Sequence, residues 1–133
     1  MNINDLAAAL RACAVGLCPV EAGVALLISN GTFLHRDDFT SRFIETGTSI
    51  SGGTTLMAAI DWDAVIAALN ADDLPCSGGD RRILQLSASL AGGTLVSLRD
   101  SVTGLDHRNA ALLVTAIRRA AANTKNRGHR TSH

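Results

Sequence analysis

Residues that can cap a helix alternate with glycines along this sequence, and this alternation constrains the fold more than any other feature. Ser77 and Asp80 form a capping box, in which a side-chain oxygen accepts from a first-turn backbone N–H and an acid answers it. Gly92 and Gly93 then supply the left-handed turn that commonly ends a helix. The sequence therefore predicts a helix over residues 77–91.

The same pattern predicts helices along the rest of the chain. The expected first residues or caps are Asn4, Pro19, Asp37 or Asp38, Asp61, Ser77, Ser97 and Asp106. Apolar residues recur every three or four positions after these starts, as in Leu6, Leu10, Cys13 and Leu17. This spacing places Cys13 in the core rather than in a reactive site.

Composition supports a mainly α protein with one domain. Only 3% of the residues are aromatic and there is no Tyr, whereas 47% are hydrophobic and 18% charged. Such a chain folds, and its aromatic scarcity disfavours a β-sandwich. We expect about six helices within residues 1–123. Residues 45–55 are rich in Gly, Ser and Thr, which predicts either a short β-hairpin near residues 43–60 or a loop.

Charge is distributed unevenly. Residues 1–106 hold six arginines and all twelve acids, whereas residues 107–133 hold six basic residues and no acid. The last ten residues, 124–133, are almost free of apolar side chains and predict a flexible basic tail. The simplest interpretation of this dipolar pattern is charge compensation within the folded protein.

The cysteines and the long apolar stretch near the start exclude several protein classes. Three cysteines without a C-x-x-C pair indicate neither a disulfide framework nor a zinc site, and a reducing cytoplasm fits them best. Arg11, Pro19 and Glu21 interrupt the stretch from 6 to 28, so no membrane span is expected. His129 and His133 lie in the expected tail, and we predict no metal and no cofactor.

One short stretch, LPCSGGDRR, suggests catalysis. Its C-x₅-R spacing resembles the phosphate loop of tyrosine-type phosphatases, which would make an anion and thiol site of Cys76, Gly78, Gly79 and Arg82. Asp80, however, puts a negative charge inside that cradle, and Pro75 stands where such loops usually carry a histidine. The capping box explains Ser77 and Asp80 together. We therefore expect a helix start and no enzyme.

The final helix, from Asp106 to about residue 122, carries the residues expected to bind a partner. At 100° per residue its apolar face consists of Ala110, Leu113, Val114, Ile117, Ala120 and Ala121. Arg108, Thr115 and Arg119 lie on the opposite face with Leu112 among them, and we predict a protein contact at Arg108, Leu112 and Arg119. The alternative is nucleic-acid binding through Arg118, Arg119, Lys125, Arg127 and Arg130.

Residues 19–45 also fit a helix-turn-helix motif, which would support nucleic-acid binding. The second helix of that motif, however, carries more acids than arginines and would repel phosphates. The segments RFIE, AIDW, LPCSGGDRR, LSASLAGG and SLRDSVTGLD resemble a group of small helical proteins of high-GC bacteria, over most of residues 6–122. No activity is attached to that group, and the resemblance implies a bacterial cytoplasmic protein. We predict a non-enzymatic interaction or regulatory module, with self-association as one form.

Overall fold

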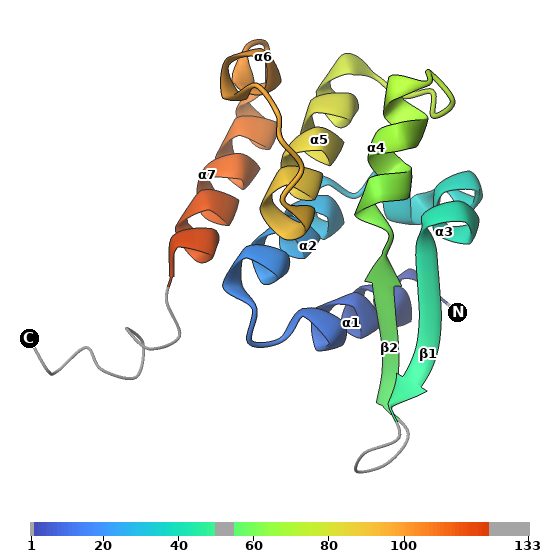
Figure 1. Ribbon diagram of the computed structural model, residues 1–133. Helices are drawn as coiled ribbons and strands as arrows, with labels where there is room; N and C mark the ends of the chain where they lie inside the picture. Colours follow the sequence, from blue (N-terminus) through green and yellow to red (C-terminus); the bar gives the residue numbers. More distant parts are fainter. Residues whose placement is uncertain (1, 50–54, 123–133) are drawn as a thin grey trace, which may run out of the picture.

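The computed structural model describes residues 2–49 and 55–122, and it confirms a mainly α fold with one short hairpin (Figure 1). The elements within these residues are α1 (Ile3–Ala14), α2 (Cys18–Asn30), the 3₁₀ helix η1 (Phe33–His35), α3 (Asp37–Phe43), β1 (Ile44–Ser49), β2 (Thr55–Ile60), α4 (Trp62–Asn70), α5 (Gly78–Gly92), α6 (Leu98–Val102) and α7 (His107–Ala121).

Four helices begin at the caps that the sequence predicts. In each, the side-chain oxygen of the cap accepts from the backbone N–H three residues later, over 2.7 to 3.2 Å, and the caps are Asp61, Ser77, Ser97 and Asp106. Glycines in the left-handed region end two helices, with φ of 86° at Gly31 and 74° at Gly93. Capping residues and glycines that the sequence shows directly therefore set most helix boundaries.

The predicted start of the first helix was wrong. Asn2, not Asn4, caps α1, because its Oδ1 accepts from the N–H of Asp5 at 2.8 Å. The helix then ends at Ala14, and Gly16 turns the chain with φ of 89°. Leu17 is consequently 57% exposed rather than part of the helical stripe. Cys13 is exposed as well, so its placement in the core was also wrong.

The third helix begins at Asp37, as predicted, but neither Asp37 nor Asp38 caps it. α3 begins after Arg36 with no side-chain cap, and the carboxylate of Asp38 accepts instead from Arg36, with Nε at 2.9 Å from Oδ1. This ion pair holds the pKa of Asp38 below its usual value. Asp38, which could cap the helix, therefore forms an ion pair with Arg36 instead.

The glycine-rich region forms the hairpin rather than a loop. β1 and β2 pair antiparallel, from Ile44 opposite Ile60 to Ser49 opposite Thr55. Residues 50–54, which connect the two strands, lie outside the described residues. Buried Ala58 and half-buried Leu56 pack the hairpin against α1, and Figure 1 shows the two strands extending past that helix.

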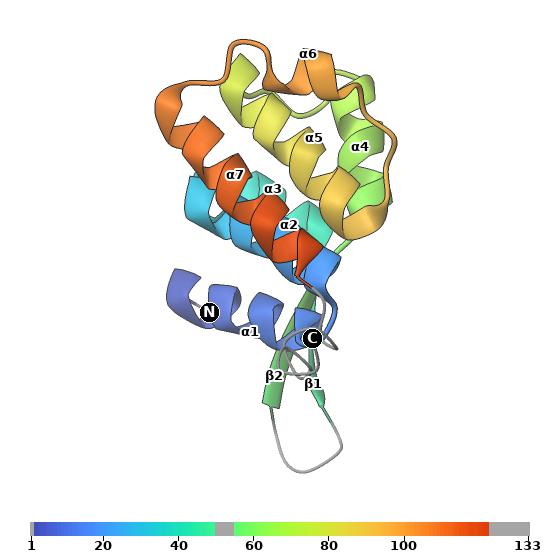
Figure 2. The ribbon, with the colours of Figure 1, turned by 90° about the vertical axis from the view of Figure 1, so that its left-hand side faces the viewer.

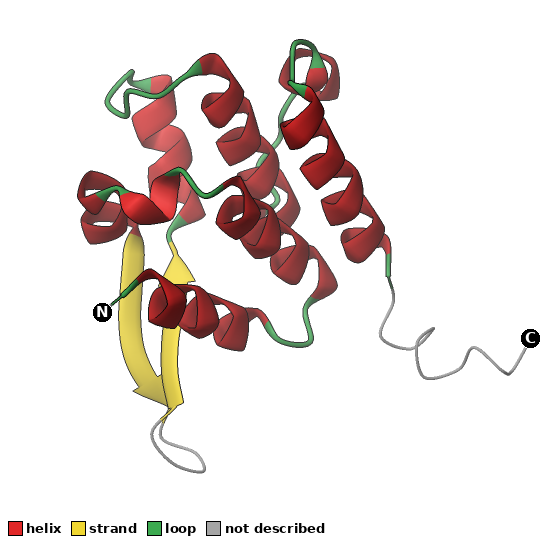
Figure 3. Ribbon diagram, turned by 180° about the vertical axis from the view of Figure 1, so that it is seen from behind, coloured by secondary structure: helices red, strands yellow, loops and turns green. Residues whose placement is uncertain are grey.

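Helix α5 lies at the centre of the core. Its residues Ile83 and Leu84 are fully buried, between α2 on one side and α4 and α7 on others. An aromatic cluster lies at one end, where the rings of Phe33, Phe39 and Phe43 follow one another at tilted angles, with centroids 5.0 and 5.2 Å apart. Seen from behind, α2 lies between α1 and α7 (Figure 3). This placement brings side chains of α1 and α7 to opposite edges of α2.

Candidate functional site on helix α7

Helix α7 is turned differently from what its sequence suggests. Leu113, Ala116 and the polar Asn109 are its buried residues, and Leu112 and Ala120 are half-buried in the cluster with α2 and α5. Val114 and Ile117, expected on the buried face, are each 48% exposed. Leu112, which lies among the arginines on the helical wheel, is therefore partly covered by the neighbouring helices.

A buried polar cluster fixes this orientation. The Nδ2 group of Asn30, at the end of α2, donates to Oδ1 of Asn109 at 3.1 Å and to Oδ1 of Asp80 at 3.3 Å. The hydroxyl of Thr32 donates to the same Asp80 oxygen at 3.3 Å. The Asp80 carboxylate thus binds α2 and the residues after it, instead of returning to Ser77 as the capping box predicts. The cluster ties the starts of α5 and α7 to the end of α2.

Arg108 takes part in the same junction. Its guanidinium donates to the carbonyl oxygens of Ser29, at 2.7 Å, and Asn30, at 3.3 Å. These carbonyls belong to the last turn of α2, where helix carbonyls have no intrahelical partner and attract cations. The residue predicted to contact a partner therefore forms an internal helix-end contact.

The exposed side of α7 carries an apolar line that the core leaves uncovered. We call Ala110, Val114, Ile117 and Ala121 the outer stripe; they follow one another at intervals of four, three and four residues. Figure 2 looks onto α7, with α2 behind it and α5 beside it. Among the described residues, five of the seven exposed large apolar side chains lie between residues 95 and 117. Exposed apolar surface is therefore concentrated in this part of the chain.

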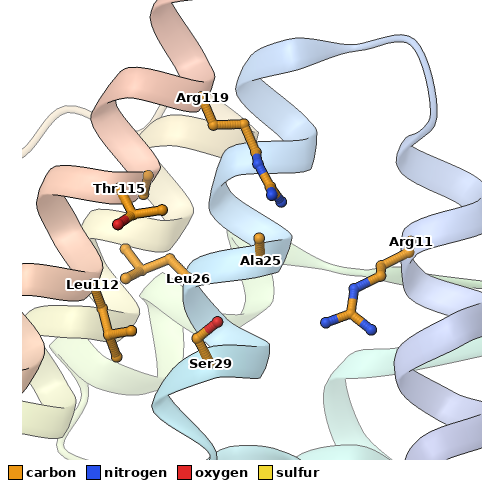
Figure 4. Close-up of a pocket in the computed structure, with 8 residues that line it drawn as sticks. Arg11, Ala25, Leu26, Ser29, Leu112, Thr115 and Arg119 are labelled. Carbon is orange, nitrogen blue, oxygen red and sulfur yellow. The ribbon is translucent and has the colours of Figure 1, made fainter.

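The opposite side of α7 borders a cavity of about 150 Å³, which we call the α1–α7 pocket (Figure 4). Arg11 extends from α1 and Arg119 from α7, and both reach toward α2 at Ala25. The remaining lining residues are Leu26, Ser29, Leu112, Thr115 and Ala116. The pocket thus unites Leu112 and Arg119, which the sequence suggested, with Arg11, which it did not.

The predicted thiol site has a different character. Cys76 is half-buried against the aromatic cluster of the core, and this burial raises the pKa of its thiol, although the nearby Arg36 and Arg81 act in the opposite direction. The guanidinium of Arg82 lies between Gly104 and Gly78, where a Cβ added at Gly78 would be 3.3 Å from one of its nitrogens, and Gly78 and Gly79 form the first turn of α5. A nucleophilic cysteine requires a lowered pKa. The surroundings of Cys76 act against the chemistry that its spacing suggests.

Of the residues predicted to bind nucleic acid, Arg118 and Arg119 are exposed in the last turn of α7, while Lys125, Arg127 and Arg130 lie outside the described residues. His129, His133 and the tail predicted over 124–133 also lie outside them. Within the described chain, no group of His, Cys, Asp and Glu side chains is arranged to hold a metal ion. In the same residues, no helix has the length and apolar character needed to span a membrane.

Comparisons of the chain with protein families, with curated proteins and with solved structures find no match. The function of the protein is therefore inferred from the two sides of α7.

Proposed function

We propose that this protein is a non-enzymatic interaction module that associates with a second copy of itself through the outer stripe of α7. The observation that supports this is the exposure of Val114 and Ile117, at 48% each, on a helix whose other side is buried. Single exposed apolar residues are ordinary. Exposed Val114, Ile117 and Ala121 form one line with half-buried Ala110. Their three- and four-residue intervals are those of a coiled-coil seam and are typical of a helix that packs against another helix.

The order of residues in the stripe favours a second copy over another protein. Small, large, large and small side chains follow one another at intervals of four, three and four, and this order is the same in either direction. Two antiparallel copies would place Ala110 opposite Ala121, and Val114 opposite Ile117. An interface around a two-fold axis has to be complementary to itself, and this pattern meets that requirement.

The size of the stripe indicates a weak dimer. α7 has 15 residues and is therefore about 22 Å long. A single pair of such helices covers less than the roughly 800 Å² per partner of a standard interface. Arg118 flanks the stripe, and α7 contains no acidic residue. Two copies of α7 therefore repel each other electrostatically, and added salt screens this repulsion. We expect association that depends on protein concentration and persists in high salt.

The test is chain mass by analytical ultracentrifugation over a range of protein concentrations, at low and high salt. Val114→Asp places charges in the seam and is expected to leave a monomer throughout. Val15→Asp is the matched control, because Val15 is 73% exposed in the connection between α1 and α2 and is expected to leave association unchanged. A wild-type monomer at all concentrations contradicts the proposal. A dimer seen only at low salt indicates instead that the basic end of one chain meets the acidic body of another.

A further inference from the structure

We propose that the α1–α7 pocket binds a small oxyanion, a carboxylate or a phosphate group, between the guanidinium groups of Arg11 and Arg119. The two arginines come from opposite ends of the described chain and both line the same cavity of about 150 Å³. Arginine presents a planar fork of N–H donors that suits the oxygens of carboxylates and phosphates. Two such forks facing one hollow favour a ligand of negative charge.

The charge around the pocket is not neutralised within the described residues. The ion pairs found there join Arg36 to Asp38, Arg42 to Asp73 and Arg81 to Asp72. Neither Arg11 nor Arg119 forms an ion pair or a hydrogen bond in this part of the chain. Those three arginines are paired with carboxylates, whereas Arg11 and Arg119, like Arg82, Arg99, Arg108 and Arg118, form no ion pair with a described residue.

One carboxylate lies close enough to compete, and its position limits that competition. Glu21 lines an adjoining hollow of about 140 Å³ together with Arg11 and Arg119. Its Oε1 accepts from the backbone N–H of Gly16 at 3.3 Å, so the carboxylate helps to hold the turn between α1 and α2. Glu21 thus bounds the site on one side and leaves the main cavity without an acid.

The other lining residues indicate the shape of the ligand. Ser29 and Thr115 contribute hydroxyl groups, and Leu26 and Leu112 contribute apolar surface. A cavity of similar volume in another protein accommodates benzene, which has about six non-hydrogen atoms. The group that fits inside the pocket is therefore a compact organic acid or phosphate ester with a short apolar part.

Isothermal titration calorimetry tests this with two probes, butyrate and methyl phosphate, in buffers matched in ionic strength with chloride. We expect saturable binding of at least one probe, and the difference between the two identifies the oxyanion. Arg119→Gln and Arg11→Gln are each expected to weaken binding at least about tenfold, as the loss of a charge-assisted hydrogen bond implies. Arg118→Gln is the matched control, since it removes the same charge from the adjacent position, and should change affinity less than about twofold.

Two results would overturn the proposal. One is the absence of saturable binding for both probes to the folded wild-type chain. The other is an equal loss of affinity in Arg118→Gln and Arg119→Gln, which would mean that the probes respond to the general charge of α7. The melting temperature of each variant shows that it is folded. The pocket and the outer stripe lie on different sides of α7, so Val114→Asp is expected to bind the probes with wild-type affinity, whether or not the protein dimerises.

Discussion

Replacing Gly23 with alanine tests how closely α2 and α5 pack. A Cβ atom at this position would lie 2.6 Å from Cβ of Ala91, 2.6 Å from the carbonyl oxygen of Ser87 and 2.9 Å from the backbone nitrogen of Ala91. Carbon atoms in favourable contact are about 3.5 to 4.0 Å apart. Two of the three contacts are with backbone atoms of α5, so no side-chain rotation relieves them, and the two helices have to move apart by nearly 1 Å.

Two opposing effects set the size of the change in stability. Alanine in a helix interior is favoured over glycine by about 1 kcal/mol. Overpacking a core costs about 1 to 3 kcal/mol, and the upper value applies here because separation of α2 from α5 disturbs the buried Leu27 and Leu84. We therefore expect Gly23→Ala to lower the free energy of unfolding by about 2 kcal/mol, and Tm by about 6 to 8 °C in a chain of this length.

Thermal unfolding followed by circular dichroism measures this effect. Gly79→Ala is the control, because a Cβ there meets only the side chain of Asn109 at an ordinary 3.7 Å, and it is expected to leave Tm unchanged or higher. The reasoning is refuted if Gly23→Ala melts at or above the wild-type temperature, as the control does. That result would mean that helix propensity outweighs the contact and that α2 and α5 are not in the close approach described above.

Three further predictions concern buried polar groups. Asn109→Ala removes the acceptor of Asn30 and is expected to cost about 2 kcal/mol, seen as a lower urea midpoint; an unchanged midpoint contradicts the structural role of the cluster. Ser87→Ala removes a fully buried hydroxyl that has no hydrogen-bond partner among the described residues and should raise stability by about 1 kcal/mol; a loss shows a hidden partner. Burial raises the pKa of the Cys76 thiol in the folded chain. The contribution of the protonated thiol to the free energy of unfolding is therefore complete below the ordinary thiol pKa of about 8.5. It is lost as pH rises through the higher pKa of the folded state. Cys76→Ala should therefore flatten the dependence of the urea midpoint on alkaline pH, and an unaltered dependence rules this out.

Local patterns made much of the fold predictable. The caps at Asp61, Ser77, Ser97 and Asp106 act within three residues of their partners, so the sequence alone contains both members of each hydrogen bond. The prediction was wrong where two nearby residues compete. Either Asn2 or Asn4 is able to cap α1, and the carboxylate of Asp38 accepts from the side chain of Arg36 instead of from the backbone N–H groups at the start of α3. The choice between two caps, or between a cap and an ion pair, depends on geometry that a spacing rule does not contain.

The pocket illustrates a stronger limit on sequence reasoning. Arg11 and Arg119 belong to helices at opposite ends of the described chain, and no spacing connects them; only the position of α2 between α1 and α7 brings them to one cavity. The sequence selected Arg119 and Leu112 because both lie on one face of α7. It could not have selected Arg11, since a single arginine in the last turn of a helix is adequately explained by the helix dipole.

The orientation of α7 leaves apolar residues exposed that the core does not account for. A helical wheel places the largest apolar group inside, yet the buried face is turned by about a quarter of a turn from it, because the amide of Asn30 takes Asn109 as its partner and Arg108 binds the end of α2. Hydrogen bonds at one end of the helix therefore prevail over burial of Val114 and Ile117. A helix that served only the core would need apolar residues on the buried side alone. The additional apolar line on α7 is accounted for when a second surface covers it, which is the reason to look for the proposed dimer on this side of the molecule.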